Sequence, residues 1–363
     1  EPCGVFAPDT PAEERFLRLF PFCTVEHSSV GDRVSIEVLV RTTDRCNQAC
    51  PFCSAPPPHP EPSFGTVCAC IDAAATTFVH PVFTLTGGEP TLRRTFIEEV
   101  RSALAEPAFS QVLVQTNAVA FAERVAAERV EPNARLGYFV SLHALDETIY
   151  DRCTGTHGQL GRALAGTRAL IEAGHRVIVN CVVGRPNLPH LPELVRRLPR
   201  ELPWHDGLEL HFSVLMCPEH RPHAPEFLVA YSELAPALEA ATRDAELAGV
   251  RVSPLRSSTH ASLPACVIAP EFRDASPRRP ELRSGETGAP SHGLAHRINA
   301  WPVGVGAIAA ESGGRGIYDT GIGLFDLLIA QVEFVQGARG KIFGQYIDFF
   351  CQLQEKITAF FGF

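Results

Sequence analysis

The sequence lacks any uninterrupted apolar run long enough to span a membrane, and no secretory signal pattern is present. It also lacks an excess of positive charge. The 32 Lys and Arg residues stand against 41 Asp and Glu, giving a net charge of −9, so no general attraction to nucleic acid is expected. Methionine occurs once, at Met216, and the chain begins with Glu1, so we expect the true N-terminus to be missing. These features predict a cytoplasmic protein without a transmembrane segment or a nucleic-acid partner.

Cysteine is abundant, with 12 residues, but most of them are too scattered to form the framework of a small disulfide-rich protein. Three of them, Cys46, Cys50 and Cys53, form a C-x3-C-x2-C run that includes Phe52 and follows a strand-like stretch. A closed zinc site would need a fourth ligand, and none lies nearby in the sequence. Three thiolates on one loop instead fit an iron–sulfur cube with one iron left open. Three buried or zinc-binding cysteines are the alternative.

Strand-like apolar runs alternate with helical patterns from Ser35 onward, which is typical of a parallel sheet covered by helices. The expected strands are Ile36–Val40, Val82–Thr86, Val112–Gln115, Gly137–Leu142, Val177–Val183 and Leu208–Val214. The expected helices lie near 66–78, 94–105, 120–128, 147–173 and 190–198, with Asp146 as an N-cap and Gly174 as a C-cap. Six such units predict an α/β fold, a partial (β/α)6 TIM-like barrel with a C-terminal extension.

Composition divides the chain into four parts. We expect an N-terminal lead-in at 1–33, a core barrel at 34–260, a linker at 261–300 and a Phe-rich, largely helical tail at 301–363. Leu and Val recur in the tail at helical spacing, which predicts a core-packing helix, with a partner-docking or membrane-surface helix as the alternative. The role of the tail stays open, as does whether it is the authentic reading frame. A Pro-rich loop at 53–64 is placed to cover the cysteine run.

Small and polar residues follow the ends of several predicted strands. They are Gly87-Gly88-Glu89-Pro90 after the second strand, Thr116-Asn117 after the third, Ser141 and His143 at the end of the fourth, and Asn180 on the fifth. The carboxyl ends of parallel strands meet at one rim of a barrel, so we expect these residues to lie near the cysteine run. A simple metal-binding module would not need this convergence, which favours an enzyme.

In their order and intervals, these motifs and the cysteine run resemble the radical S-adenosylmethionine (radical SAM) superfamily, over roughly 34–260. The similarity is closer to the branch with peptide-modifying maturases and the molybdenum-cofactor cyclase. The resemblance implies that Cys46, Cys50 and Cys53 hold a [4Fe-4S] cluster whose fourth iron binds S-adenosylmethionine. It further implies an enzyme that reductively cleaves this cofactor to a 5′-deoxyadenosyl radical. That radical abstracts hydrogen from a peptide or small-molecule substrate, and a low-potential electron donor supplies the electron.

The resemblance also assigns cofactor-binding roles to five residues near the cysteines. Phe52 is expected to shield the cluster or to pack near the adenine. Gly87 and Gly88 are expected to let the backbone approach the cofactor, because neither carries a Cβ. A carbonyl of this turn, together with Glu89, would receive the cofactor's ammonium group. Pro90 would fix the chain as it turns toward the next helix.

Further candidates are polar residues on the later strands. Asn117 and Ser141 suit hydrogen bonds to a ribose or carboxylate, although each is equally suited to a turn or cap. Asn180 lies on an apolar strand and needs a partner if it is buried, with the cofactor and a backbone group as the two candidates. His143 and His211 either face the substrate cavity or are hydrogen-bonded core histidines.

The sequence departs from the peptide-modifying relatives in its C-terminal part. Many of them carry a Cys-rich extension that binds auxiliary clusters, whereas only Cys266 and Cys351 follow Cys217 here. We therefore expect a single cluster, and the peptide-maturation prediction weakens. A small-molecule cyclase, isomerase or methyl-transfer relative on the same barrel is the runner-up. From a different class, a non-catalytic iron–sulfur or zinc-binding partner-docking protein is the alternative. No motif identifies the substrate.

Overall fold

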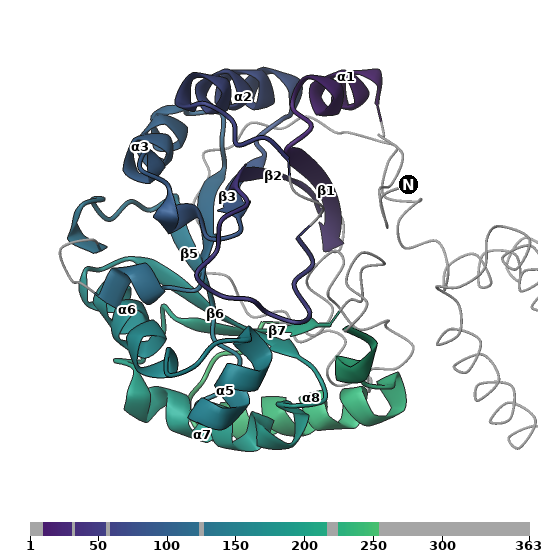
Figure 1. Ribbon diagram of the computed structural model, residues 1–363, viewed down its shortest axis with the longest axis vertical. Coiled ribbons are helices and arrows are strands. Elements are labelled where there is room, and N and C mark those ends of the chain that lie inside the picture. Colours follow the sequence, from purple (N-terminus) through teal and green to yellow (C-terminus); the bar gives the residue numbers. More distant parts are fainter. Residues whose placement is uncertain (1–9, 31–32, 56–58, 123–126, 216–223, 254–363) are drawn as a thin grey trace, which may run out of the picture. The chain divides into compact units, whose positions relative to one another are not determined.

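The computed structural model describes residues 10–30, 33–55, 59–122, 127–215 and 224–253. Within these ranges, seven strands form one curled sheet whose helices lie on its outer side (Figure 1). The strands are β1 (Cys23–Val30), β2 (Arg33–Thr43), β3 (Val82–Gly87), β4 (Gln111–Thr116), β5 (Leu136–Ser141), β6 (Arg176–Val183) and β7 (Glu209–Val214). The strands lie in the sheet in their sequence order. β1 is antiparallel to β2, and each pair of neighbours from β2 to β7 is parallel. The six parallel strands confirm the predicted partial barrel.

Helices and short turns join the strands, as parallel neighbours require. The helices are α1 (Pro11–Leu19), α2 (Phe64–Thr77), α3 (Phe96–Ala105), α5 (Glu147–Thr154), α6 (Leu160–Glu172), α7 (Leu191–Glu201) and α8 (Tyr231–Leu247). The 3-10 turns are η1 (Pro90–Leu92), η2 (Val119–Ala122), η3 (Leu188–His190) and η4 (Ala224–Phe227). In the described ranges, no helix combines the length and the apolar character needed to cross a bilayer.

One expected helix differs from the structure, and other expected segments are described in part. The helix expected at 147–173 is divided into α5 and α6, because Gly155 and Gly158 between them have φ values of +63° and +69°. The expected lead-in at 1–33 contains a helix and a strand, α1 and β1. Of the helix expected at 120–128, the structure describes the turn η2 and residues 127–128, which are helical. The expected linker at 261–300 and tail at 301–363 lie outside the described residues.

The sheet has a fully buried outer face and a partly accessible inner face. On the outer face, Val38 of β2 pairs in register with Phe83 of β3. Both side chains are 0% exposed beneath the helices. The alternate positions point inward, and those such as Glu37, Thr86 and Gln115 keep partial exposure. The inner face thus carries polar side chains where a fully packed barrel would carry apolar ones.

Candidate active site at the cysteine loop

The three clustered cysteines lie on the connection from β2 to α2, residues 44–63, here called the cysteine loop. All three are free thiols; Cys46 is exposed, and Cys50 and Cys53 are partly buried. Desolvation by the surrounding protein raises the pKa of Cys46 to about 11, with smaller contributions from Glu89 and Cys53. Burial raises the pKa of Cys50 further, and the two other thiols of the run add to that shift. The three thiols therefore lie close enough to influence one another electrostatically.

The arrangement of these thiols bears on which metal group they fit. Because the pKa values of Cys46 and Cys50 are raised, both of these thiols are protonated at neutral pH, and an incoming metal has to displace their protons. Among the described residues, no group of three or more His, Cys, Asp or Glu side chains is arranged to hold a metal ion. Three thiols on one loop are nevertheless the donor set of an iron–sulfur cube in which each thiolate binds its own iron and one iron stays open, so the residues present fit that group. Zinc binding by the same thiols stays the alternative.

The Gly-Gly-Glu-Pro turn at the end of β3 is docked on the start of the cysteine loop. The amide of Gly88 donates to the carbonyl of Thr43 and the amide of Glu89 to that of Arg45, both at 2.7 Å. A Cβ on Gly87 would lie 2.4 Å from the Thr43 oxygen, and one on Gly88 would lie 2.3 Å from the Arg45 oxygen. Both glycines are therefore needed for contact with the chain's own backbone. Their predicted approach to the cofactor stays a prediction.

The Glu89 carboxylate joins this turn to the end of β4. It is 1% exposed. Its Oε1 accepts hydrogen bonds from the amide and the hydroxyl of Thr91, at 3.2 and 2.5 Å, and from Thr116 Oγ1 at 2.7 Å. Its Oε2 accepts one from the amide of Asn117 at 2.8 Å. Burial raises the pKa of Glu89 and these donors oppose the shift. Because Oε2 has a single partner, it retains capacity for a further donor such as the predicted ammonium. Pro90 begins the turn η1.

Both predicted asparagines have partners within the protein. Asn117 Nδ2 donates to Asn47 Oδ1 of the cysteine loop at 2.6 Å, and Asn117 Oδ1 accepts from the amide of Val119 at 3.1 Å. Asn117 thus makes the turn contact that was its alternative role, and it also holds the loop. Asn180 accepts from Ser213 Oγ on the neighbouring strand at 2.7 Å. This partner is neither of the two that the sequence suggested.

Phe52, a residue of the cysteine loop, packs against the buried ring of His143. Its ring centroid is 5.3 Å from that of His143 and 5.9 Å from that of Phe227, and Phe52 is buried. His143 Nδ1 accepts a hydrogen bond from the amide of Val182 at 3.2 Å. Burial lowers the pKa of His143 to about 4, so the ring is neutral at pH 7 and Nε2 carries its proton. His143 is hydrogen-bonded in the core, and its Nε2 is a potential donor beside the predicted cofactor site.

Three other candidates form a row across the sheet. Ser141 on β5 pairs in register with Asn180 on β6, and Asn180 pairs with His211 on β7. Residues paired in this way point to the same face, here the inner one. The His211 ring lies 5.5 Å from that of Phe139, and burial lowers the pKa of His211 to about 4 against an opposing effect of Glu209. The sheet therefore brings these predicted polar residues together on its concave side.

The sequence did not predict how the cysteine loop is seated on α5. The amide of Ala49 donates to the carbonyl of Thr154 at 2.9 Å, and Gln48 Nε2 donates to Tyr150 Oη at 2.9 Å. Gly155, with a φ of +63°, ends α5, and a Cβ there would lie 2.4 Å from the Ala49 oxygen. The glycine pattern signals the end of a helix, but nothing in the sequence tells which distant loop packs against it.

Part of the chain that includes this site is similar to known proteins. Residues 40–198 match the radical SAM superfamily. A probable GTP 3′,8-cyclase of Methanopyrus kandleri is 32% identical over 210 residues, which are 56% of this chain and 65% of that protein. A PqqA peptide cyclase of Rhodopseudomonas palustris is 28% identical over 172 residues, 45% of this chain and 43% of that protein. The chain thus spans less than two thirds of the length of either relative.

A solved structure supports the same fold. Streptococcus suis SuiB bound to S-adenosylmethionine superimposes with a TM-score of 0.50 at 15% identity, covering 60% of this chain and 49% of that one. The family match begins in β2 and ends in α7, so it includes the cysteine loop, the Gly-Gly-Glu-Pro turn and the strand ends that carry Asn117 and Ser141. Over residues 40–198, this barrel is therefore similar to the radical SAM superfamily.

Proposed function

We propose that this protein is an enzyme that reductively cleaves S-adenosylmethionine at one [4Fe-4S] cluster and abstracts hydrogen from an organic substrate. The observation that carries the proposal is the docking of the Gly-Gly-Glu-Pro turn on the start of the cysteine loop. That contact gathers three thiols, a buried carboxylate and Asn117 at the carboxyl ends of β2, β3 and β4. Ligands bind at this end of parallel strands in barrels and related folds.

Each of these residues has a role that its surroundings permit. Cys46, Cys50 and Cys53 would hold the cluster, which when bound supplies the electron that breaks the sulfonium–C5′ bond of S-adenosylmethionine. Glu89 Oε2 accepts one hydrogen bond and can accept the ammonium group of the cofactor's methionine part. Phe52 of the cysteine loop packs against the ring of His143 and would help to exclude water from the reaction.

The substrate is proposed to be a polar small molecule or a peptide on the concave face of the sheet. The relatives are named for GTP and for a peptide, which are both polar. Ser141, Asn180 and His211 form a polar row on this face. A cytoplasmic location and a low-potential electron donor belong to the same proposal.

Anaerobic reconstitution of the full chain tests this function. We expect about four irons and four sulfides per chain, and 5′-deoxyadenosine when dithionite and S-adenosylmethionine are added. Cys50→Ala should abolish both. Cys68→Ala is the matched control, because Cys68 is a partly buried thiol on α2 outside the cysteine loop. A full cluster that yields no 5′-deoxyadenosine would refute the enzymatic proposal, as would a Cys50→Ala protein as active as the control.

A further inference from the structure

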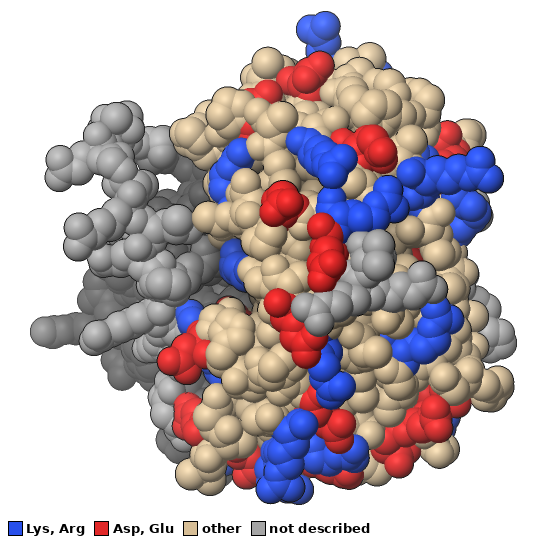
Figure 2. All heavy atoms as spheres, turned by 90° about the vertical axis from the view of Figure 1, so that its left-hand side faces the viewer, with Lys and Arg blue, Asp and Glu red and all other residues tan. Residues whose placement is uncertain are grey.

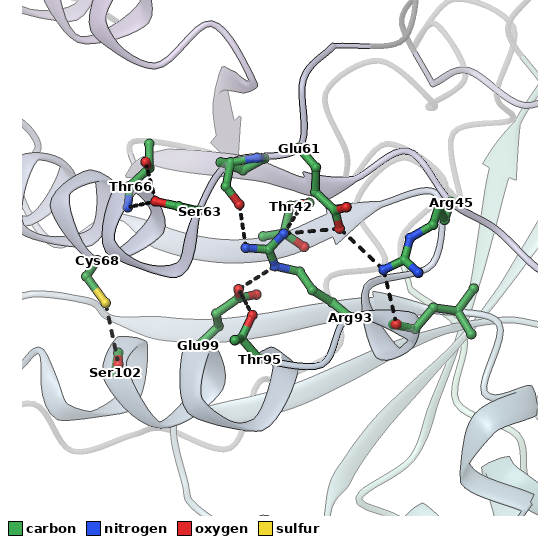
Figure 3. Close-up of polar contacts among 12 residues, drawn as sticks. Thr42, Arg45, Glu61, Ser63, Thr66, Cys68, Arg93, Thr95, Glu99 and Ser102 are labelled. Atoms are coloured by element: carbon green, nitrogen blue, oxygen red, sulfur yellow. Dashed lines mark hydrogen bonds and ion pairs between the residues drawn. The ribbon is translucent and has the colours of Figure 1, made fainter.

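A buried guanidinium ties together the two ends of the cysteine loop. Arg93 directly follows the turn η1, and 7% of its side chain is exposed. Its Nη1 donates to the carbonyl of Thr42 at 2.9 Å and its Nη2 to that of Pro62 at 2.6 Å (Figure 3). Thr42 precedes the first cysteine and Pro62 follows the last. One side chain therefore holds the two ends of the cysteine loop at a fixed separation.

Arg93 is itself held by an acidic residue of α3. Its Nε donates to Glu99 Oε1 at 2.5 Å, and Thr95 Oγ1 donates to the same oxygen at 2.7 Å. The Glu99 side chain is 0% exposed, and Arg93 Nη1 also lies 3.1 Å from Glu61 Oε1 (Figure 3). The guanidinium thus donates from three nitrogens in three directions, a geometry that the single ammonium of lysine does not reproduce.

A neighbouring arginine offers a natural comparison. Arg45 also lies on the cysteine loop and contacts the same Glu61, but 61% of its side chain is exposed and its Nη2 is 3.5 Å from Glu61 Oε1 (Figure 3). Its other contact, to the carbonyl of Leu92, is 3.4 Å long. Exposed pairs of this kind contribute little to stability. The two arginines carry the same charge, but only Arg93 is buried between the ends of the cysteine loop.

We propose that Arg93 is a positioning residue for the cluster: it fixes the base of the cysteine loop, so that the three thiols are presented in one arrangement. The inference rests on the proposed function, since it needs a cluster to position. It concerns a contact with two backbone carbonyls, and not a contact with the cluster or with S-adenosylmethionine. Metal–ligand distances fall within about 0.2 Å of their standard values. A loosened base should therefore change the cluster more than it changes the fold.

The first test needs no cluster. Hydrogen exchange is measured on the metal-free full chain for amides of the cysteine loop and, as a reference, of β5. In Arg93→Gln we expect exchange at the loop to rise at least about tenfold, with β5 unchanged. Arg93→Gln leaves Glu99 buried without its cation, so Arg93→Gln/Glu99→Gln is made as well and should behave alike. Arg45→Gln should exchange as the wild type does.

The second test uses the reconstituted protein. We expect the cluster absorbance of the Arg93 variants to decay several-fold faster in the presence of an iron chelator. Their electron paramagnetic resonance spectrum, with and without S-adenosylmethionine, should differ from that of Arg45→Gln. Arg93→Lys should not restore either property. The proposal is overturned if Arg93 and Arg45 variants agree in loop exchange and cluster lifetime, or if β5 exchange rises by the same factor as the loop. A wild type that takes up no cluster refutes the proposed function, while the exchange comparison still decides whether Arg93 holds the loop.

Discussion

Replacing Gly155 by alanine measures how tightly the cysteine loop is seated on the end of α5. Gly155 has a φ of +63°, and an L-residue in that conformation costs about 1–2 kcal/mol. Its Cβ would lie 2.4 Å from the carbonyl oxygen of Ala49 and 2.9 Å from the carbonyl carbon. Since favourable contact distances are about 3.5 Å, the two segments would have to separate by about 1 Å.

The cysteine loop is the side expected to move. The amide of Gly155 donates to the carbonyl of Asp151 at 2.8 Å within the helix end, whereas the amide of Ala49 is held to Thr154 by one bond of 2.9 Å. Losing that bond adds about 1 kcal/mol, so we expect the free energy of unfolding of the metal-free protein to fall by about 2–3 kcal/mol. A loop shift near 1 Å is several times the range of about 0.2 Å within which metal–ligand distances fall. Iron uptake should therefore suffer more than stability.

The control is Gly249→Ala. Gly249 has a φ of +69°, but no atom lies within 4 Å of its added Cβ, so this variant should lose only the backbone cost of about 1–2 kcal/mol. Denaturant unfolding of the metal-free chains and iron content after reconstitution are compared. The reasoning is refuted if Gly155→Ala and Gly249→Ala have the same unfolding midpoint and retain the same iron.

Three further predictions concern single side chains. Glu89→Gln should lower the free energy of unfolding by about 1–3 kcal/mol, because an amide donor would then face the amide of Asn117, and denaturant titration measures this. Burial lowers the pKa of His211 to about 4, so below pH 6.5 the unfolded chain binds a proton that the folded chain does not. Stability should fall from pH 6.5 toward 4, and His211→Gln should flatten this part of the curve. Tyr150→Phe should cost about 1 kcal/mol by leaving Gln48 Nε2 unpaired.

These predictions have distinct contrary outcomes. An unchanged unfolding midpoint for Glu89→Gln would mean that the carboxylate does not need both oxygens as acceptors. A His211→Gln stability curve parallel to that of the wild type between pH 6.5 and 4 would show that this ring does not cause the acid sensitivity. An equal midpoint for Tyr150→Phe would show that solvent replaces the phenol as the partner of Gln48.

The parallel strands were predictable because each is an apolar run bounded by turn residues and followed by a helix. The predicted strand Val82–Thr86, for example, matches β3 except that β3 continues for one more residue, to Gly87. The edge strand β1 was missed because polar residues dominate Cys23–Val30, and its strand form depends on antiparallel pairing with β2. The helix α8 was also missed; it contains Pro236, a residue that sequence patterns treat as a helix breaker.

For the site, the sequence predicted which residues converge and not what they touch. The order of motifs along parallel strands predicted that Ser141 and Asn180 lie near each other, and the register adds His211 beside Asn180 on the same face. The contacts of Arg93 and Gly155, by contrast, are made to backbone carbonyls far away in the chain. Any residue offers a backbone carbonyl, so no side-chain pattern records such a contact.

The ties on the cysteine loop have a consequence for how this protein matures. The loop is made early in synthesis, yet its frame comes from segments made later: the turn after β3, Arg93, and the end of α5 with Gly155. A nascent chain that ends before α5 carries all three thiols without the surface on which the loop rests. Stable cluster insertion should then wait until the chain has been synthesised and packed through α5, and iron uptake by stalled chains of increasing length would show this as a step.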